Sequence, residues 1–512
     1  SLTVSYSDSL NSFSAAALSS ISSNLTIQEN ADLTDVDLSS LECVSDYTIE
    51  GNDLTEADHY ALLVQITCAS EDSLIVFRDD DADDFCSGGD TEVENLYINA
   101  LGADPIDLSC IETITGYLEI ENSITSSINL SGLTSVGDEV YIHENDDMES
   151  IDLSSLSSVG SYLYVYYNDA LESLDLSSLT TIDSYFYINQ NTNLETLDLS
   201  GLTTVESSVQ IYNNDALDDL SMPVLTEING SLTIEYNDAF TDLYMPALEV
   251  LNGEFYVYSN DNLETIDFSG LVEVNSGFYL QNNYALESVD MSLLETVSSS
   301  FYIYNNDNLD TFLVDSLSEV DSTFYFYDND GMDVLELPTL TEVNGSLTVS
   351  YSDSLTSFSA PLLETLSSSL TIQENSDLTD VDLGSLYCVS DYTIEGNDLT
   401  DADQYDLLVQ LTCASEDSLI VFRHDDADDF CDSGETEVEN LYINALGSDD
   451  IDLSCIETIT GYLEIENSIA PSIDLSGVTR IDDEVYIHEN DDLESIDLSA
   501  LQTVDSYVYI YS

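Results

Sequence analysis

The sequence predicts an all-β fold, a right-handed parallel β-solenoid whose coils are about 22–23 residues long. A long internal repeat is the first observation, because residues 1–167 match residues 346–512 at 132 of 167 positions, with 35 differences. A shorter period is the second, because apolar residues recur every 23 positions inside the 345-residue super-repeat. These residues are Leu163, Phe186, Val209, Leu232, Phe255, Phe278, Phe301, Phe324, Leu347 and Leu370. A 23-residue unit cannot bury its apolar face alone, so successive coils are expected to stack.

The repeat also predicts the domain organisation. Residues 1–345 form a first super-repeat of 15 coils (15 × 23 = 345), and residues 346–512 form a partial second super-repeat. The earlier coils are expected to start at Leu2, Leu25, Tyr47, Leu74, Leu96, Leu118 and Val140. We therefore expect the chain to be a window on a longer repetitive protein.

One coil, residues 163–185, illustrates the pattern. Its first segment alternates, with Leu163 and Val165 on one side and Tyr164 and Tyr166 on the other, which is the period of a strand. Apolar residues then follow at spacings of two and three, too short for an amphipathic helix: Leu171, Leu174, Leu176, Leu179 and Ile182. This spacing suits a chain that turns every few residues.

An asparagine recurs directly after the first segment of most coils. The column comprises Asn145, Asn168, Asn191, Asn214, Asn237, Asn260, Asn283, Asn306, Asn329, Asn375 and Asn490. A residue repeated in nearly every coil is a poor candidate for catalysis. We expect an asparagine ladder that satisfies backbone groups where each coil turns.

The coil pattern L-x-[IV]-x-x-N-x-x-L-x-x-[LIV]-x-[LF]-x-x-L-x-x-[VI] resembles the receptor L-domain group of leucine-rich-repeat-like β-helices. Such β-helices occur in growth-factor-receptor ectodomains, fungal cell-wall proteins and microbial surface proteins. This chain has about 22 coils, more than the handful of an L domain, and lacks the cysteine-rich modules between L domains. The resemblance implies an extracellular or cell-surface β-helix.

All eight cysteines lie in two inserts, at about residues 43–110 and 388–455. An even number in one irregular patch suggests disulfides, and zinc is the competitor, although neither a CxxC motif nor a Cys/His cluster is present. Three connectivities are open in each insert. We favour Cys43–Cys68, Cys86–Cys110, Cys388–Cys413 and Cys431–Cys455, because each pair encloses one short excursion. Within the insert, residues 54–67 predict a short helix, with Thr55 and Asp58 as a capping box.

The densest acidic run, residues 78–90, suggests a calcium loop. Asp79, Asp81 and Asp83 have the alternate spacing of calcium ligands, and Asp90 is at the twelfth position. Asp84 stands where such a loop needs Gly, and His424 replaces Asp79 in the second copy. The acidic counterparts there are Asp426, Asp428 and Glu435. The alternative is a solvated acidic loop, and Ca²⁺ is the only candidate cofactor.

The charge excludes several classes of function. The chain has 104 acidic and 3 basic residues, a net charge of −101. Nucleic-acid binding and phosphate clamping both need clustered Lys and Arg, so neither is expected here. The sequence also has no apolar run long enough to span a membrane. At roughly 4.8 Å per coil the solenoid carries about one negative charge per ångström. It therefore needs a cation atmosphere.

Outward tyrosines on the first segments form columns that define a candidate interaction surface. One column includes Tyr164, Tyr187, Tyr256, Tyr279, Tyr302 and Tyr325. Same-face stacking within the sheet explains such a column, and so does a surface that binds sugar rings or another strand of the same fibre. Sequons at Asn24, Asn129, Asn229 and Asn344 are candidate N-glycosylation sites.

The expected function is structural. Of four histidines only His143 and His488 correspond between the copies, and near-identical coils offer no distinct catalytic site, so an enzyme is not expected. We predict a structural subunit segment of an extracellular filament or cell-surface stalk that self-associates laterally and end to end. The alternative is an adhesin or glycan-binding surface protein.

Overall fold

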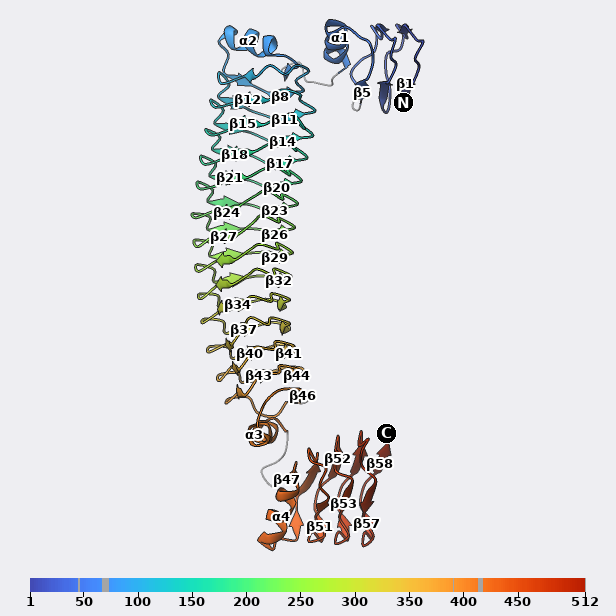
Figure 1. Cartoon of the computed structure of the whole chain (residues 1–512), viewed down its shortest axis with the longest axis vertical. Helices are drawn as coiled ribbons and strands as arrows, with labels where there is room; N and C mark the ends of the chain where they lie inside the picture. Colours follow the sequence, from blue (N-terminus) through green and yellow to red (C-terminus); the bar gives the residue numbers. More distant parts are fainter. Residues whose placement is uncertain (45–46, 67–72, 390, 413–417, 512) are drawn as a thin grey trace. The chain divides into compact units, whose positions relative to one another are not determined.

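The computed structural model describes residues 1–44, 47–66, 73–389, 391–412 and 418–511, which form parallel β-solenoid turns with four helices (Figure 1). The chain divides into two compact units, Ser1–Asp333 and Val334–Ser512. The predicted all-β solenoid is confirmed in each unit. Its right-handed winding stays a prediction.

Each turn contains up to three short strands. In one turn these are β17 (Leu163–Tyr166), β18 (Ser173–Asp175) and β19 (Thr181–Ile182). Each pairs in parallel with the corresponding strand of the next turn, in the registers Leu163↔Phe186, Ser173↔Thr196 and Thr181↔Thr204. All three registers differ by 23 residues, so one sequence period is one turn of the solenoid.

The first unit repeats this plan. Its first strands are β1 (Leu2–Ser5), β3 (Leu25–Gln28), β5 (Tyr47–Glu50), β6 (Ser73–Val76), β8 (Asn95–Ile98), β11 (Leu118–Glu121), β14 (Val140–His143), β17, β20 (Phe186–Asn189), β23 (Val209–Tyr212), β26 (Leu232–Glu235), β29 (Phe255–Tyr258), β32 (Phe278–Gln281), β35 (Phe301–Tyr304) and β38 (Phe324–Tyr327). Its second strands are β2 (Ser12–Ser14), β4 (Asp35–Asp37), β9 (Ile106–Asp107), β12 (Ser127–Asn129), β15 (Ser150–Asp152), β18, β21 (Thr196–Asp198), β24 (Asp219–Ser221), β27 (Asp242–Tyr244), β30 (Thr265–Asp267), β33 (Ser288–Asp290) and β36 (Thr311–Leu313). Its third strands are β7 (Glu92–Val93), β10 (Thr113–Ile114), β13 (Ser135–Val136), β16 (Ser158–Val159), β19, β22 (Thr204–Val205), β25 (Glu227–Ile228), β28 (Val250–Leu251), β31 (Glu273–Val274), β34 (Thr296–Val297) and β37 (Glu319–Val320).

The second unit has the same turns. Its first strands are β41 (Leu347–Ser350), β44 (Leu370–Gln373), β46 (Tyr392–Glu395), β47 (Ser418–Val421), β49 (Asn440–Ile443), β52 (Leu463–Glu466), β55 (Val485–His488) and β58 (Val508–Tyr511). Its second strands are β39 (Val334–Glu336), β42 (Ser357–Ser359), β45 (Asp380–Asp382), β50 (Ile451–Asp452), β53 (Ser472–Asp474) and β56 (Ser495–Asp497). Its third strands are β40 (Glu342–Val343), β43 (Thr365–Leu366), β48 (Glu437–Val438), β51 (Thr458–Ile459), β54 (Arg480–Ile481) and β57 (Thr503–Val504).

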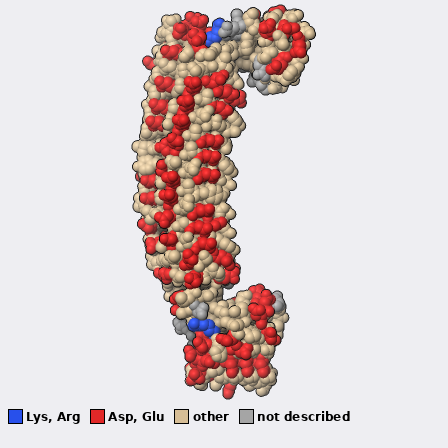
Figure 2. Space-filling view, viewed as in Figure 1, with Lys and Arg blue, Asp and Glu red and all other residues tan. Residues whose placement is uncertain are grey.

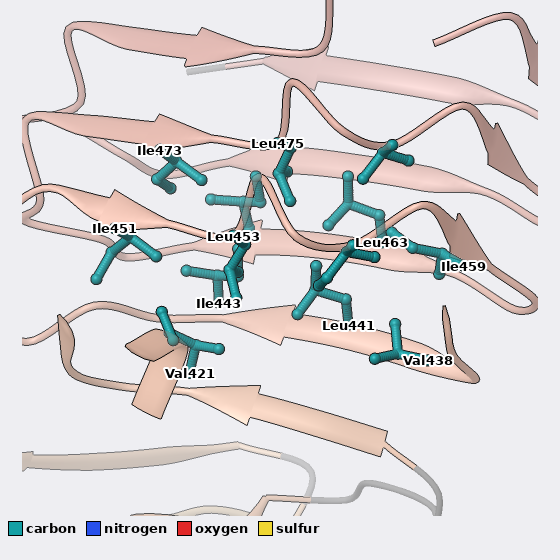
Figure 3. Packing of buried hydrophobic residues seen from close by; sticks show 14 of the residues in the cluster. Val421, Val438, Leu441, Ile443, Ile451, Leu453, Ile459, Leu463, Ile473 and Leu475 are labelled. Carbon is teal, nitrogen blue, oxygen red and sulfur yellow. The ribbon is translucent and has the colours of Figure 1, made fainter. Parts of the chain in front are cut away.

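The core lies inside the turns, as the alternation predicts. Leu163 and Val165 are fully buried, whereas the outward Tyr164 and Tyr166 are half-buried. The other apolar positions of this coil are also buried: Leu171, Leu174, Leu176, Leu179 and Ile182. In the second unit, branched aliphatic side chains from successive turns fill the same interior (Figure 3). Stacking therefore joins the apolar faces of single turns into a shared core.

The predicted asparagine ladder is present, and Asn260 shows how it works. Its side-chain oxygen accepts the backbone N–H of Asn237 at 3.1 Å, and its amide donates to the carbonyl of Ile234 at 3.0 Å. Both partners belong to the preceding turn, so each Asn joins two turns. The residue before it, Ser259, has a positive φ of 51°, which turns the chain and brings the Asn inward.

Each insert interrupts the stack and carries two helices. These are α1 (Glu56–Ile66) and α2 (Asp79–Gly88) in the first unit, and α3 (Asp401–Leu411) and α4 (His424–Ser433) in the second. In the described residues, strand pairing stops at β5 and resumes at β6, and it stops at β46 and resumes at β47. The predicted helix is confirmed as α1, whose Asp58 backbone N–H donates to Thr55 Oγ1 at 3.2 Å. The second helix of each insert was not expected.

Two predicted disulfides are confirmed. Cys86–Cys110 and Cys431–Cys455 connect α2 and α4 to the turn after β9 and β50, with Cα–Cα distances of 5.6 and 5.5 Å. Cys68 and Cys413 lie outside the described residues, so Cys43–Cys68 and Cys388–Cys413 stay predictions.

Removing Cys86–Cys110 by a double serine substitution should destabilise the α2 region. Closing a loop with a 24-residue separation typically contributes about 2–4 kcal/mol. We expect faster amide exchange in α2 and at β9, measured by mass spectrometry. The control is the distant turn around β29, whose exchange should not change. Unchanged protection of α2 would contradict the prediction.

Candidate functional site

The outer face of the first strands is the most distinctive surface of the first unit. From β14 to β38 there are nine such strands with two outward positions each, eighteen in all. Twelve are tyrosines, which we call the tyrosine strip: Tyr141, Tyr164, Tyr166, Tyr187, Tyr212, Tyr256, Tyr258, Tyr279, Tyr302, Tyr304, Tyr325 and Tyr327. Glu235 is the only acidic residue among the eighteen. The strip is therefore poor in carboxylates in a chain with 104 of them.

Neighbouring tyrosines of the strip contact one another along the stack. The ring centroids of Tyr141 and Tyr187 each lie 5.2 Å from that of Tyr164. Farther along the unit, Tyr279 and Tyr302 are 5.5 Å apart and nearly parallel. This contact is the same-face stacking that stabilises a sheet. It leaves these tyrosines half-buried.

The strip is electrically neutral. Burial, followed by the influence of neighbouring tyrosines, raises the pKa of Tyr164 above its usual value. Burial and the charge of Glu144 raise the pKa of Tyr166 to about 12. Both phenols therefore keep their protons at physiological pH and offer hydroxyl groups and apolar ring surface without charge.

A Glu–Glu–His cluster lies at the beginning of the strip. Glu121 on β11 pairs in register with His143 on β14, and Glu119 precedes Glu121 by two residues on the same outward face. The His143 Nε2 atom is 3.7 Å from Glu119 Oε1 and 3.9 Å from Glu121 Oε2. One donor atom from each side chain falls within 4.8 Å of the others.

The second super-repeat builds the same cluster from Glu464, Glu466 and His488 on β52 and β55. The His488 Nε2 atom is 3.5 Å from Glu464 Oε1 and 3.6 Å from Glu466 Oε2. In the described residues these two clusters are the groups of three or more His, Cys, Asp or Glu side chains that meet this spacing. Each lies in its own unit, so the arrangement is built twice.

Aromatic side chains hold each cluster in place. The imidazole of His143 stacks on Tyr166 with centroids 4.9 Å apart and planes 4° apart, and His143 is only 12% exposed. The hydroxyl of the buried Tyr97 donates to Glu121 Oε1. Burial raises the pKa of Glu121, and the Tyr97 hydrogen bond acts in the opposite direction. Glu121 is thus oriented by a hydrogen bond, and both carboxylates are partly removed from water.

These residues were not recognised as a site from the sequence. His143 and His488 correspond between the copies, but this correspondence alone does not indicate a site. The coil starts Leu118 and Val140 already imply a register that sets Glu121 opposite His143, and the structure has this register. Combining that register with the recurrence of both Glu and His at the 345-residue offset would have found the cluster.

The predicted calcium loop is corrected by the structure. Residues Asp79–Gly88 form the helix α2, so Asp79, Asp81 and Asp83 do not have the conformation of a calcium-binding loop. Asp81 instead caps this helix, because its Oδ2 atom accepts the backbone N–H of Phe77 at 3.1 Å and of Arg78 at 3.0 Å. Asp90 lies beyond the helix, exposed to solvent.

The second copy repeats this arrangement in α4. Asp426 accepts the backbone N–H of Phe422 at 3.0 Å and of Arg423 at 2.7 Å, and Asp428 lies 3.2 Å from His424 Nε2. Glu435 is exposed after the helix. Capping of a helix therefore explains why both copies have Asp at this position, Asp81 and Asp426. Calcium binding by the acidic residues of the two copies stays a prediction.

Other acidic residues stabilise the turns by accepting hydrogen bonds from the backbone. Asp152, Asp175 and Asp198 end their strands. The carboxylate of each accepts a hydrogen bond from the backbone N–H of the residue two positions later in the sequence, at 2.9–3.1 Å. Hydrogen bonds from the side chain of Ser454 and from its backbone N–H lower the pKa of Asp452. Acidic side chains are spread along the turns in rows (Figure 2). Part of the charge thus shapes the backbone.

The candidate glycosylation sites differ in their surroundings. Asn24 and Asn344 are exposed. Asn129 is half-buried and donates to Asp107 Oδ1 at 3.0 Å, and Asn229 donates to Glu206 Oε2 at 3.0 Å. Glycosylation at all four positions stays a prediction.

Searches against known proteins give little guidance. No family model and no curated protein matches the chain. Seven chains of solved structures match, and one is TLR13 in its crystal structure with ssRNA13. That match has 12% identity and a TM-score of 0.18, and it covers 95% of this chain and 80% of that one. In the described residues, no helix is both long and apolar enough to cross a membrane.

Proposed function

We propose that this chain is a structural segment of an extracellular filament or cell-surface stalk, assembled laterally through the tyrosine strip. The observation that carries the proposal is the strip itself, with twelve tyrosines and one carboxylate in eighteen outward positions. Such a surface carries little charge and is partly apolar in a protein of net charge −101. Exposed aromatic surface of this extent is typical of an interface.

Electrostatics supports the same surface. Two solenoids of equal negative charge repel each other wherever their carboxylates approach within about 8–10 Å at ordinary ionic strength. The strip is where two copies can approach with the least repulsion. The acidic turns would then face solvent and their counterions.

Repetition supports a structural role over a catalytic one. The turns share one plan, and from β14 to β38 most outward positions of the first strands are tyrosines. The disulfides of the inserts fit an oxidising compartment outside the cytoplasm. These properties suit a protein whose task is to extend and to associate.

Substituting Tyr279 with glutamate should abolish lateral assembly while keeping the turn intact. The new charge would lie in the middle of the strip, between Tyr256 and Tyr302, and would repel its equivalent in the partner. We expect thick bundles to give way to single strands in electron micrographs, and the sedimentation coefficient to fall to that of a single strand.

Two controls accompany this variant. Tyr244→Glu adds the same charge at an exposed tyrosine outside the strip and should leave the bundles unchanged. Dialysis of the unmodified protein to low ionic strength with a chelator should loosen bundles, since screening weakens. Bundles of unchanged diameter in Tyr279→Glu would contradict assembly through the strip. Isolated rods that bind glycans through these tyrosines would favour the adhesin.

A further inference from the structure

We propose that Glu119, Glu121 and His143 bind a first-row transition-metal dication, with zinc as the reference ion. The equivalent residues Glu464, Glu466 and His488 would bind a second ion. The proposal rests on the geometry of one imidazole and two carboxylates, independently of how the protein assembles.

The distances fit an ion at the centre of the three side chains. Zinc bonds nitrogen and carboxylate oxygen at about 2.0–2.2 Å, which in a tetrahedral site places its ligand atoms roughly 3.3–3.6 Å from one another. The measured Nε2–O distances are 3.7 and 3.9 Å in the first cluster. They are 3.5 and 3.6 Å in the second. Small side-chain shifts would bring every ligand atom to bonding distance.

The type of ligand selects the class of ion. Calcium and magnesium prefer oxygen ligands, whereas imidazole with carboxylates suits zinc and its first-row neighbours. This distinction matters because a chain with 104 carboxylates binds calcium and magnesium diffusely at many places. His143 and His488 are the histidines that distinguish the two clusters from the general acidic surface.

Neighbouring aromatic side chains fix ligand residues of both clusters. Tyr97 donates to Glu121, and its counterpart Tyr442 donates to Glu466, so the same hydroxyl orients one carboxylate in both copies. His143 stacks on Tyr166, and His488 stacks on Tyr511 with centroids 5.3 Å apart. Hydrogen bonds to metal-binding carboxylates and fixed imidazole rings both strengthen metal binding.

The bound ion would join adjacent turns. In the first unit it would connect β11 to β14, and in the second β52 to β55. Water would complete its coordination at the outer face, because Glu119 and Glu121 remain about one-third and one-quarter exposed. It would also offset two glutamate charges.

The competing explanation is a protonated imidazole paired with two carboxylates and no metal. Equilibrium dialysis of the full chain against Zn²⁺, with millimolar Ca²⁺ and Mg²⁺ present to occupy diffuse acidic sites, separates the two. We expect two tightly bound Zn²⁺ per chain. Co²⁺ in place of zinc should give visible absorption from a nitrogen- and oxygen-bound ion.

Variants assign the binding to these residues. His143→Gln with His488→Gln should remove both tight ions, weakening binding at least by the 10- to 100-fold that supporting residues alone cause. Glu119→Gln with Glu464→Gln should do the same while keeping both stacked rings. Tyr97→Phe with Tyr442→Phe should weaken binding by about 10- to 100-fold without changing the number of sites.

A matched control uses the natural difference between the copies. His59→Gln introduces the residue that the second copy carries at Gln404 and should leave both ions bound. Zinc should also raise the thermal midpoint of the unmodified chain and not that of the double histidine variant. Failure to bind two ions above the calcium and magnesium background, or two ions retained by both ligand variants, would overturn the proposal.

Discussion

Replacing Phe278 with alanine is expected to cost about 3–5 kcal/mol of unfolding free energy. Its fully buried ring lies 4.2 Å from that of Phe255 and 4.7 Å from that of Phe301, measured between centroids. Alanine would leave a cavity between two rings held by the strands on either side, so neither can move far to fill it. The loss is both of buried apolar surface and of ring contacts.

The effect of Phe278→Ala should be measured both on the unfolding of the whole chain and on the turns around the substitution. Long repeat arrays need not unfold in one step, so denaturant titration should be combined with hydrogen exchange in β29, β32 and β35. Phe278→Leu is the matched control, because the same column holds Leu232 and Leu347 in other turns. It should cost clearly less than alanine. Equal effects of the two substitutions would contradict the cavity argument, because leucine fills most of the volume that alanine leaves empty.

Replacing Asn260 with alanine is expected to cost about 3 kcal/mol or more. Its side chain satisfies the backbone N–H of Asn237 and the carbonyl of Ile234, and both groups are in the buried ladder. Each buried polar group left without a partner typically costs about 1–3 kcal/mol. Because the two groups belong to the preceding turn, we expect increased amide exchange in β26 as well as in β29.

Serine at position 260 provides the comparison. In the turn after the first insert Ser123 occupies the ladder position, and its Oγ accepts the backbone N–H of Ala100 at 3.0 Å. Serine can therefore replace the acceptor of the asparagine but cannot reach the carbonyl of the preceding turn. Asn260→Ser should lose less stability than Asn260→Ala. If alanine and serine were both tolerated, the ladder would not be a source of stability.

The period and the direction of the side chains could be predicted from the sequence. Apolar residues at a spacing of two require a strand, and their return every 23 residues requires equal turns. Leu163, Phe186 and Val209 are accordingly buried and pair in register. The asparagine column was predictable for the same reason, because a residue repeated in most turns meets its own copy.

The inserts were only partly predictable, because they break that period. The helix α1 has an apolar stripe and a capping threonine, and both signals are local. The acidic run was ambiguous, since the alternate aspartates of a calcium loop also suit the start of a helix. Asp81 caps α2, and Ala82 is buried, which favours the helix.

What the sequence determined is therefore whatever repeats along the chain: the turn, its inward face, the ladder and the carboxylate-poor strip. What only the tertiary structure decided is where unlike residues of different turns meet. Glu121 and His143 are the fourth residues of paired strands, but only the structure shows that their side chains approach each other and that Tyr97 reaches the same carboxylate from the turn before. A local pattern sets the period and the face of a strand, but contacts between turns depend on the register of the stacked strands and on side-chain direction. Those are properties of the assembled sheet.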